Sequence, residues 1–321
     1  MKEIIISRLD ENQRIDKYVR KYLSDAPLSF IYKLFRKKDV KINGHWVKEN
    51  YIVKAGETLT IYVTDEQLKE FVKEKEVNKK PLSFPIVYED ENILIVNKPR
   101  GILVHGDNKE KRLTLSNEVL NYLYYKGEFD PKINNGFTPA PAHRLDRNTS
   151  GLVLFGKNLK SLQQLEEMFK EKKDIEKHYY ALVKGKVDGI LEIDAPLKKD
   201  PNSGLVKVAS LKEGGLEAKS IVKPVKLYKA FSLVDVNLVT GRTHQIRVHL
   251  SYEGFPIIGD SKYGDFSLNK EFKNKYGFEN QFLHAYSIKF KKIEGILSYL
   301  SNKNFTSELP LNMKKVLEEL N

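Results

Sequence analysis

Residues 142–151 (AHRLDRNTSG) combine one acid with several cations and hydroxyls. Asp146 lies between Arg144 and Arg147, and the apolar run that follows residue 150 places this segment in a loop before a strand. Neighbouring cations favour the ionised carboxylate. A permanently ionised Asp suits a nucleophile or an electrostatic stabiliser better than a proton donor. The alternative is an Asp that caps a turn or pairs with arginine for structural reasons.

Residues 239–250 (VTGRTHQIRVHL) form a second candidate segment. The spacing predicts a helix capped by Thr243 and running to about Glu253, with Ile246 and Leu250 facing the core. Cationic side chains beside a positive helix terminus would make an anion site. A period-two strand remains the alternative. The polar residues near the predicted helix start are Arg242, His244, Gln245 and Arg247.

Residues 176–183 (EKHYYALV) contain a third candidate, Tyr179, at the start of a predicted strand. Its ring could serve as a stacking platform for an unstacked base. The alternative is that Tyr179 and Tyr180 are ordinary strand aromatics.

Composition limits the remaining chemistry. The chain has no Cys, which excludes disulfides, thiolate metal sites and a Cys nucleophile. His244 and His249 lie five residues apart rather than the four of a helical zinc pair, so we expect no metal. No apolar run reaches the ~18 residues of a membrane span, and no secretory signal is visible, so we expect a cytoplasmic protein. The net charge of +12 favours polyanions, chiefly nucleic acid, as partners, although a lysine-rich proteome would also explain it.

A chain of 321 residues is long enough for two domains. Charge-rich residues 65–83 read as a short helix followed by a linker, which separates a unit at residues 1–64 from one at residues 84–321. In the first unit we predict helices at residues 16–23 and from Ser29, which is a candidate N-cap. We predict strands at residues 39–44 and 58–63, with Asn43-Gly44 as a tight turn between Ile42 and Trp46. Its basic residues between positions 33 and 54 are Lys33, Arg36, Lys37, Lys38, Lys41, Lys48 and Lys54.

The second unit alternates strand-like and helix-like patterns, which predicts an α+β fold with a mixed or antiparallel sheet. The expected strands are residues 84–90, 92–99, 151–156, 178–183 and 231–239, and the expected helices are residues 116–125 and 159–172.

Three segments in this order, residues 143–151, 177–183 and 241–249, resemble the motifs of the RluA/RluC/RluD-type pseudouridine synthases. Residues 97–105 and 256–264 are also similar to stretches of that family, and the resemblance covers about residues 84–292. The chain differs at residues 105–107 (HGD), where members often have His-Pro-Gly, and at Gly156, where Ala is common.

The resemblance implies conversion of uridine in RNA to pseudouridine with no cofactor or metal. It assigns the essential carboxylate to Asp146, attacking either the ribose or the base, paired with Arg247. It makes Tyr179 the stacking aromatic and a candidate base for the carbon-five proton, while Arg144 would help to hold the rearranged RNA. We also expect Arg242 and His244 to contact RNA.

Residues 14–63 resemble the small RNA-binding domain named after small-subunit ribosomal protein four. That resemblance places RNA phosphates on Lys33, Arg36, Lys37, Lys38 and Lys41. We expect a monomer acting on large-subunit ribosomal RNA, with transfer RNA as the second choice and no DNA. Two further hypotheses are a non-catalytic ribosome assembly factor and a base-excising glycosidase. The glycosidase usually needs two working carboxylates, and we expect no second acid to accompany Asp146.

Overall fold

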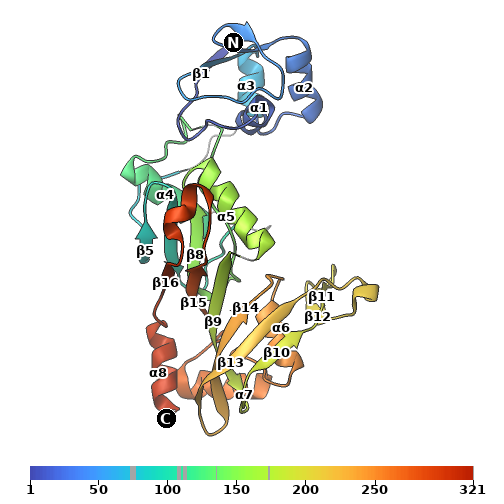
Figure 1. Cartoon of the computed structure of the whole chain (residues 1–321), viewed down its shortest axis with the longest axis vertical. Coiled ribbons are helices and arrows are strands. Elements are labelled where there is room, and N and C mark those ends of the chain that lie inside the picture. Colours follow the sequence, from blue (N-terminus) through green and yellow to red (C-terminus); the bar gives the residue numbers. More distant parts are fainter. Residues whose placement is uncertain (73–76, 107–109, 111–113, 135, 173, 321) are drawn as a thin grey trace.

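The computed structural model describes residues 1–72, 77–106, 110, 114–134, 136–172 and 174–320. Two groups of elements, each with its own sheet and buried apolar cluster, lie at opposite ends of the long axis (Figure 1). We call residues 1–72 the N-terminal unit and the residues from 77 onward the catalytic unit.

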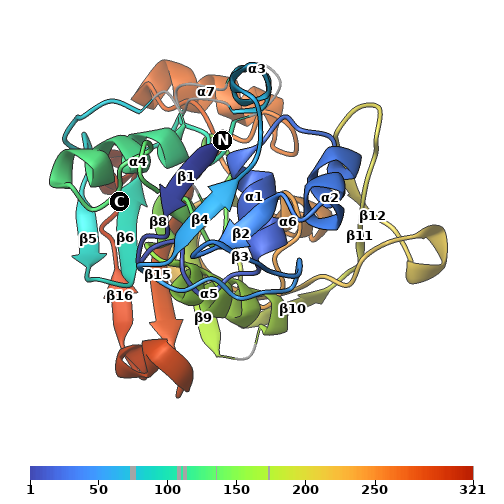
Figure 2. The same ribbon diagram turned by 90° about the horizontal axis from the view of Figure 1, so that it is seen from above.

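The N-terminal unit packs two amphipathic helices on one face of a four-stranded antiparallel sheet of order β1-β4-β2-β3 (Figure 2). The apolar residues of the second helix, Ile31, Leu34 and Phe35, face inward and are buried. The elements are β1 (Lys2–Ile5), α1 (Ile15–Tyr22), α2 (Leu28–Arg36), β2 (Val40–Ile42), β3 (His45–Trp46), β4 (Thr58–Ile61) and α3 (Asp65–Phe71). Asn43 and Gly44, both with positive φ, form the predicted turn between β2 and β3.

Two details of this unit differ from the sequence prediction. Helix α2 begins at Leu28 after Pro27, so the prediction that Ser29 caps it is wrong. Pro27 has the fixed φ that suits a helix start, and Ser29 already lies in the first turn. Strand β1 was not predicted, because a four-residue strand with one buried position carries almost no periodic signal. The predicted short helix after residue 64 is confirmed as α3, which a Thr64–Gln67 capping box starts.

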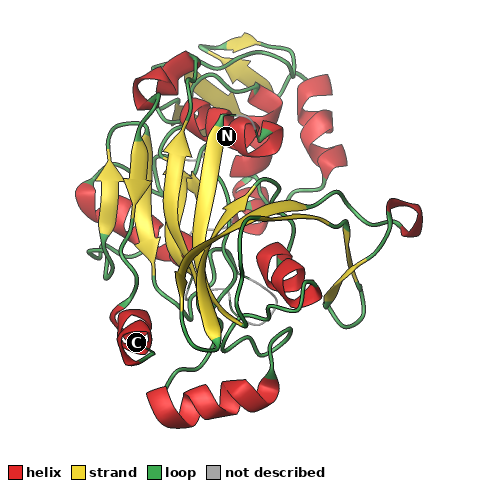
Figure 3. Cartoon of the chain, turned by 60° about the horizontal axis from the view of Figure 1, so that its bottom comes forward, coloured by secondary structure: helices red, strands yellow, loops and turns green. Residues whose placement is uncertain are grey.

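The catalytic unit is built on one large sheet of order β10-β13-β14-β9-β15-β8-β6-β5, with β16 added beside β15 and β7 beside β8 (Figure 3). Neighbouring strands are antiparallel except for β8 and β15, which are parallel. Its strands are β5 (Ile86–Glu89), β6 (Ile93–Lys98), β7 (Ala140–Pro141), β8 (Ser150–Gly156), β9 (Ile175–Lys184), β10 (Leu191–Asp194), β13 (Lys219–Leu227), β14 (Phe231–Leu238), β15 (Leu283–Phe290) and β16 (Asn304–Thr306). A separate hairpin joins β11 (Leu197–Lys199) and β12 (Val206–Val208).

Helices cover both faces of this sheet, which confirms the α+β prediction. Every residue of β8 is buried: Leu152 and Leu154 pack in one apolar cluster with α5, and Val153 and Phe155 in another with α4. Burial on both faces explains why this strand reads as a continuous apolar run. The helices are α4 (Leu115–Lys126), α5 (Leu159–Glu171), α6 (Gln245–Tyr252), α7 (Phe266–Tyr276) and α8 (Leu311–Glu319), with 3-10 turns η1 (Leu211–Glu213) and η2 (Gly295–Leu300).

The two units are docked through a buried carboxylate. The side chain of Asp10, which is 0% exposed, accepts hydrogen bonds from the backbone N–H groups of Gly136 at 2.8 Å and Phe137 at 2.6 Å. A Cβ atom at Gly136 would lie 2.1 Å from the ring of Tyr18, so only glycine permits this approach. The N-terminal unit is therefore held against the catalytic unit by specific contacts as well as by the connecting chain.

None of the helices in the described ranges has the length and apolar composition that crossing a bilayer requires.

Candidate active site

Asp146 lies in the predicted loop, between β7 and β8, and its side chain is 29% exposed. The loop is anchored by its own backbone, since Thr149 N–H donates to the Asp146 carbonyl at 3.1 Å. The next carbonyl, that of Arg147, accepts from Gly101 N–H at 2.9 Å and from Lys98 Nζ at 3.1 Å. The carboxylate is thus presented by a loop whose backbone is held from two sides.

Lys98 is a buried cation that none of the sequence motifs indicated as a site residue. Its ammonium donates to the carbonyls of Pro99, Ile102 and Arg147 at 3.0, 2.8 and 3.1 Å. Burial lowers the pKa of Lys98 to about 7, while three acceptors match the three N–H bonds of the charged form. Lys98 therefore joins the end of β6 to the Asp146 loop.

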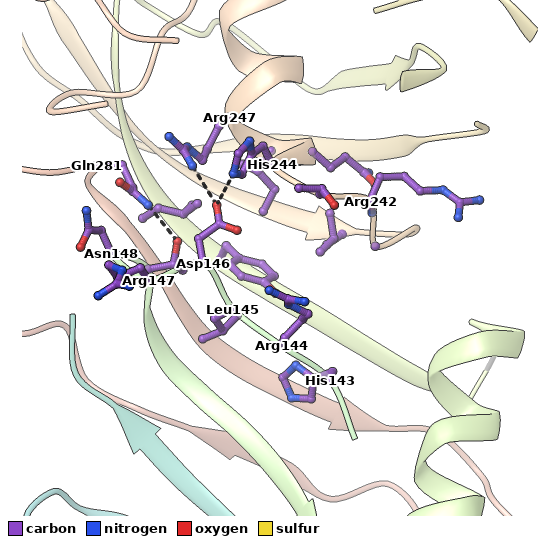
Figure 4. Close-up of a pocket in the computed structure, with 18 of the residues that line it drawn as sticks. His143, Arg144, Leu145, Asp146, Arg147, Asn148, Arg242, His244, Arg247 and Gln281 are labelled. Carbon is purple, nitrogen blue, oxygen red and sulfur yellow. Dashed lines mark hydrogen bonds and ion pairs between the residues drawn. The ribbon is translucent and has the colours of Figure 1, made fainter. Parts of the chain in front are cut away.

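Arg247 on α6 bridges two carboxylates. Its Nη1 donates to Asp146 Oδ2 at 2.9 Å (Figure 4). Its Nε and Nη2 donate to Asp260 Oδ2 at 2.6 Å and Oδ1 at 2.8 Å. The Arg247 side chain is 6% exposed and that of Asp260 is 0% exposed. Burial alone would raise the pKa of Asp260, but hydrogen bonds from Arg247 and from the N–H groups of Lys262 and Tyr263 lower it below its ordinary value. The bidentate pair fixes the guanidinium plane, which in turn aims Nη1 at Asp146.

His244 also faces Asp146. Its Nε2 lies 4.0 Å from Asp146 Oδ2, and its Nδ1 lies 2.9 Å from the hydroxyl of Tyr263. That hydroxyl already accepts the N–H of Val206 at 2.9 Å, so we assign its proton to the bond with Nδ1 and the imidazole proton to Nε2. Burial lowers the pKa of His244, which favours this neutral form. Both Arg247 and His244 therefore point donors at the same oxygen, Oδ2 (Figure 4).

The other oxygen of Asp146 has no hydrogen-bond partner within the part of the chain that the structure describes. One oxygen is thus held by cationic and polar donors, whereas Oδ1 is left unengaged. This arrangement orients the carboxylate through Oδ2 and leaves Oδ1 open toward a ligand of the cavity.

The start of α6 differs in detail from the prediction. The helical interpretation of residues 239–250 is confirmed, and the strand alternative is wrong. The predicted Thr243 cap is also wrong, because His244 occupies the N-cap with φ of 54° and no side-chain cap is present. A left-handed backbone conformation is strained for a residue other than glycine. At His244 this conformation turns the imidazole toward Tyr263 and Asp146.

Tyr179 lies in β9 and lines the same cavity as Asp146, although its side chain is only 6% exposed. Burial, followed by the nearby charge of Asp146, raises the pKa of Tyr179. The phenol is therefore neutral near pH 7, a state that suits a stacking surface. Acting as a base would require loss of its proton against this shift.

The cavity has a volume of about 790 Å³, within the range of small-molecule sites. Its lining cations include Arg144, Lys177, Lys199 and Lys262. Arg144 is exposed at the loop, whereas Arg242 extends away from Asp146 and donates to the Glu217 carbonyl at 2.9 Å (Figure 4). The structure thus brings Asp146, Tyr179, His244 and Arg247 together.

The basic residues predicted in the N-terminal unit belong to a separate surface and do not line this cavity. These residues are Lys33, Arg36, Lys37, Lys38 and Lys41. Among the described residues, no cluster of three or more His, Cys, Asp or Glu side chains is arranged to hold a metal ion.

Asp260 is a second acid at the site, which the sequence motifs did not lead us to expect. It lies within residues 256–264, so a lone acid after the apolar pair Ile257-Ile258 was the available signal. Both of its oxygens are bound to Arg247, so it acts as a structural partner of the guanidinium.

The sequence differs from the family pattern at two places, residues 105–107 and Gly156. Asp107 lies outside the described residues. At Gly156 a Cβ would lie 2.5 Å from Leu162 Cα, so glycine lets α5 approach β8 closely.

Comparisons with known proteins identify the family of the chain. The family model described as RNA pseudouridylate synthase matches residues 92–252, which contain Asp146, Tyr179 and Arg247. The chain belongs to this family, whose members isomerise uridine to pseudouridine in RNA.

Within the family it is of the RluA type, with relatives named ribosomal large subunit pseudouridine synthase C. The Vibrio parahaemolyticus protein is 36% identical over 283 residues, or 87% of this chain and 85% of the relative. The Haemophilus influenzae protein is 33% identical over 323 residues, or 100% of this chain and 95% of the relative.

Solved structures show the same fold. Human RNA pseudouridylate synthase domain containing 4 has a TM-score of 0.55 at 23% identity, covering 73% of this chain and 92% of that one.

Proposed function

We propose that this enzyme isomerises specific uridines of large-subunit ribosomal RNA, using Asp146 and no cofactor or metal. The name shared by its relatives supports the choice of RNA. The observation that carries the proposed chemistry is the asymmetric environment of Asp146: Arg247 and His244 face Oδ2, and Oδ1 lacks a partner among the described residues.

In the proposed reaction, the bond between ribose carbon one and base nitrogen one breaks, and a bond from the same ribose carbon to carbon five of the base forms. Nitrogen one gains a proton, and carbon five loses one. The Asp146 carboxylate attacks the ribose or the base, and Arg247 orients it through Oδ2. Tyr179 holds the detached base by stacking, which restricts it while it turns.

The cationic lining of the cavity supports RNA as the substrate. A target uridine must leave its stack to reach Asp146, at a cost of a few kcal/mol. Arg144 at the loop is placed to contact the rearranged strand, and Arg242 and His244 contribute to the same surface. Because Arg242 points toward Glu217, we assign it to strand contacts at the edge of the cavity.

We further propose that residues 1–64 form an RNA-binding domain of the ribosomal-protein-four type, joined by residues 65–83 to a catalytic domain at residues 84–321. Exposure of Lys33, Arg36, Lys37 and Lys38 supports this role. We propose a cytoplasmic monomer that acts on RNA and not on DNA.

The test is to map pseudouridines in total RNA from cells with and without this protein. Loss of modified positions in large-subunit ribosomal RNA, restored by the wild-type gene and not by Asp146→Asn, is the expected result. Loss of pseudouridines from transfer RNA alone would mean that transfer RNA, and not large-subunit ribosomal RNA, is the substrate. Release of free uracil from RNA by the purified enzyme would indicate a glycosidase instead.

A further inference from the structure

A second, shallow cavity of about 530 Å³ lies on the N-terminal unit and shares no lining residue with the Asp146 cavity. It is formed where the end of α2, the β2–β3 hairpin and the residues after β4 meet. Its walls include Lys37, Lys38, Lys41, Trp46 and Tyr62. The reaction proposed above uses no group in this cavity.

The strand register explains why two aromatic rings lie on this surface. Lys41 pairs with Trp46 on one side and with Thr60 on the other, so all three side chains share one face of the sheet. Tyr62 lies two residues beyond Thr60 and therefore points to the same face. The alternate residues of β2, Val40 and Ile42, are buried in the core on the opposite face. Trp46 and Tyr62 are each 42% exposed.

Each ring is accompanied by a lysine. Lys38 Nζ lies 5.2 Å from the centroid of the Trp46 ring, and Lys41 Nζ lies 5.0 Å from the centroid of Tyr62. These are cation–π distances. The cavity thus combines flat apolar surfaces with positive charge.

The turn after α2 places Lys38 in this cavity. Lys38 N–H donates to the Phe35 carbonyl at 3.0 Å, and Asp39 N–H donates to the Leu34 carbonyl at 2.9 Å. These two hydrogen bonds form a Schellman motif. The left-handed position of that motif, usually glycine, is Lys38 with φ of 61°. A residue strained in this way is typical of a functional surface.

We propose that this cavity binds an unpaired nucleotide of RNA, with its base stacked on Trp46 and Tyr62 and its phosphates bound by Lys37, Lys38 and Lys41. The proposal rests on RNA being the substrate and adds base stacking to the phosphate contacts proposed for the N-terminal unit. Paired bases in a duplex present their edges and phosphates but not their faces, so the exposed rings favour a single-stranded segment.

The first experiment uses Trp46 as its own reporter, because it is the single tryptophan of the 321-residue chain. The full-length protein is titrated with a single-stranded oligouridylate and with an abasic ribose-phosphate strand of the same length and charge. We expect the oligouridylate to bind more tightly and to change the Trp46 fluorescence. Equal affinity for the two strands with no fluorescence change would overturn the proposal.

Substitutions of Trp46 and Tyr62 test whether the base stacks on these two rings. Trp46→Ala and Tyr62→Ala should each weaken oligouridylate binding by about 5- to 150-fold, the factor that corresponds to losing one stacked base. Their affinity for the abasic strand should stay within about twofold of wild type, and Trp46→Phe, which keeps a ring, should retain most of the binding. Wild-type affinity of both alanine variants for oligouridylate would show that the rings do not bind bases.

Two controls separate this proposal from the proposed function. Tyr125→Ala removes a tyrosine that is 57% exposed on α4 of the catalytic unit, and it should leave both affinities unchanged. Turnover of a short saturating RNA hairpin by Tyr125→Ala should also equal that of wild type. Absence of turnover in the wild type would contradict the proposed function, whereas the binding comparison would still decide the stacking proposal.

Discussion

The two oxygens of Asp146 have different surroundings, and this difference governs what single substitutions should do. Oδ2 is the oxygen that Arg247 Nη1 reaches at 2.9 Å, and His244 Nε2 lies 4.0 Å from the same atom. The aspartate is therefore oriented through one oxygen while the other faces the cavity. Substitutions of Asp146 should affect the chemical step, and substitutions of Arg247 should affect the orientation of the carboxylate.

Asp146→Asn should reduce isomerisation by roughly 10³-fold or more, because it removes the anion while preserving volume. RNA affinity should remain within about twofold of wild type. Single-turnover release of tritium from carbon five of the labelled uridine measures the first quantity, and filter binding measures the second. Multiple turnover by this variant near the wild-type rate would exclude Asp146 as the reacting group.

Arg247→Met should destabilise the protein by about 3–5 kcal/mol, because it leaves carboxylates without their cation, one of them fully buried. Asp146 would also lose the donor that orients it, so single-turnover activity should fall more than in Arg247→Lys. Arg247→Lys should rescue only in part, since an ammonium cannot make the bidentate contact with Asp260.

Asp260→Asn is the matched control for Arg247→Met. It keeps Arg247 beside Asp146 and removes only the carboxylate that orients the guanidinium. Single-turnover activity should fall, but less than in Arg247→Met, because the hydrogen bond from Arg247 to Asp146 is kept. Equal losses of activity in both variants would mean that this direct contact does not contribute to activity.

At the scale of elements, the Asp146 loop depends on how β8 meets β15. These strands are parallel neighbours, and Gly151 opposes Ala285 across the pair. Gly151 has φ of 118°, and a Cβ there would lie 2.2 Å from the Ala285 carbonyl oxygen. Glycine at this position is therefore what lets β8 pack against β15 so soon after the Asp146 loop.

Gly151→Ala should destabilise the protein by about 2–4 kcal/mol, from backbone strain together with overpacking. It should also lower activity in the remaining folded protein, because displacement of β8 moves the Asp146 loop. Chemical denaturation and single-turnover assays measure the two effects. Gly189→Ala is the control, since Gly189 has φ of 93° but nothing within 4 Å of the added Cβ. Equal losses in both variants would assign the effect to backbone strain alone.

At the scale of the whole molecule, buried histidines link stability to pH. His284 is 0% exposed, with Nδ1 2.8 Å from Ser150 Oγ and Nε2 3.0 Å from Ser307 Oγ. Burial lowers the pKa of His284 to about 4, against an ordinary value of 6.5. Between these values the unfolded chain binds a proton that the folded protein does not, so stability falls as pH decreases from about 6.5 toward 4.

The expected decrease in stability from His284 is about 2 kcal/mol between pH 7 and pH 5. Urea denaturation at the two values measures it. His284→Asn should be less stable at pH 7 but should show a smaller difference between pH 7 and pH 5. A variant with the wild-type pH dependence would remove His284 as the cause.

The docking of the two units determines how RNA binding by the N-terminal unit is best tested. Deleting that unit would also remove the Asp10 carboxylate from the N–H groups of Gly136 and Phe137. Replacing Arg36, Lys37 and Lys41 together with Gln instead leaves this docking in place. The slope of log affinity against log salt should become shallower by roughly 0.7–0.9 for each RNA phosphate that the variant no longer binds.

Turnover of a short saturating substrate by this triple variant should be unchanged. The control replaces three exposed lysines that line neither cavity, Lys223, Lys229 and Lys315, with Gln. An equal change of slope in both triple variants would show that net charge, and not this surface, determines the salt dependence.

The sequence alone predicted most helices and strands because their signals are local. Apolar spacing identified α5 and β8, and Asn43-Gly44 identified the hairpin between β2 and β3. The strand termini and helix caps were less accurate, as at Ser29 and Thr243, because the residue that starts a helix is chosen partly by the packing of the whole helix. Asp146 was recognisable because its neighbours in the chain are themselves cations and hydroxyls.

The tertiary structure decided which distant groups act on Asp146. Lys98, Arg247 and Asp260 are far from residue 146 in the chain, and no spacing rule relates them. Their contacts exist because β6, β8 and α6 converge at one place in the fold. Since these groups are buried, each charge is stabilised by its partner rather than by water. That convergence lets one guanidinium bridge two carboxylates. It also gives the two oxygens of Asp146 different surroundings.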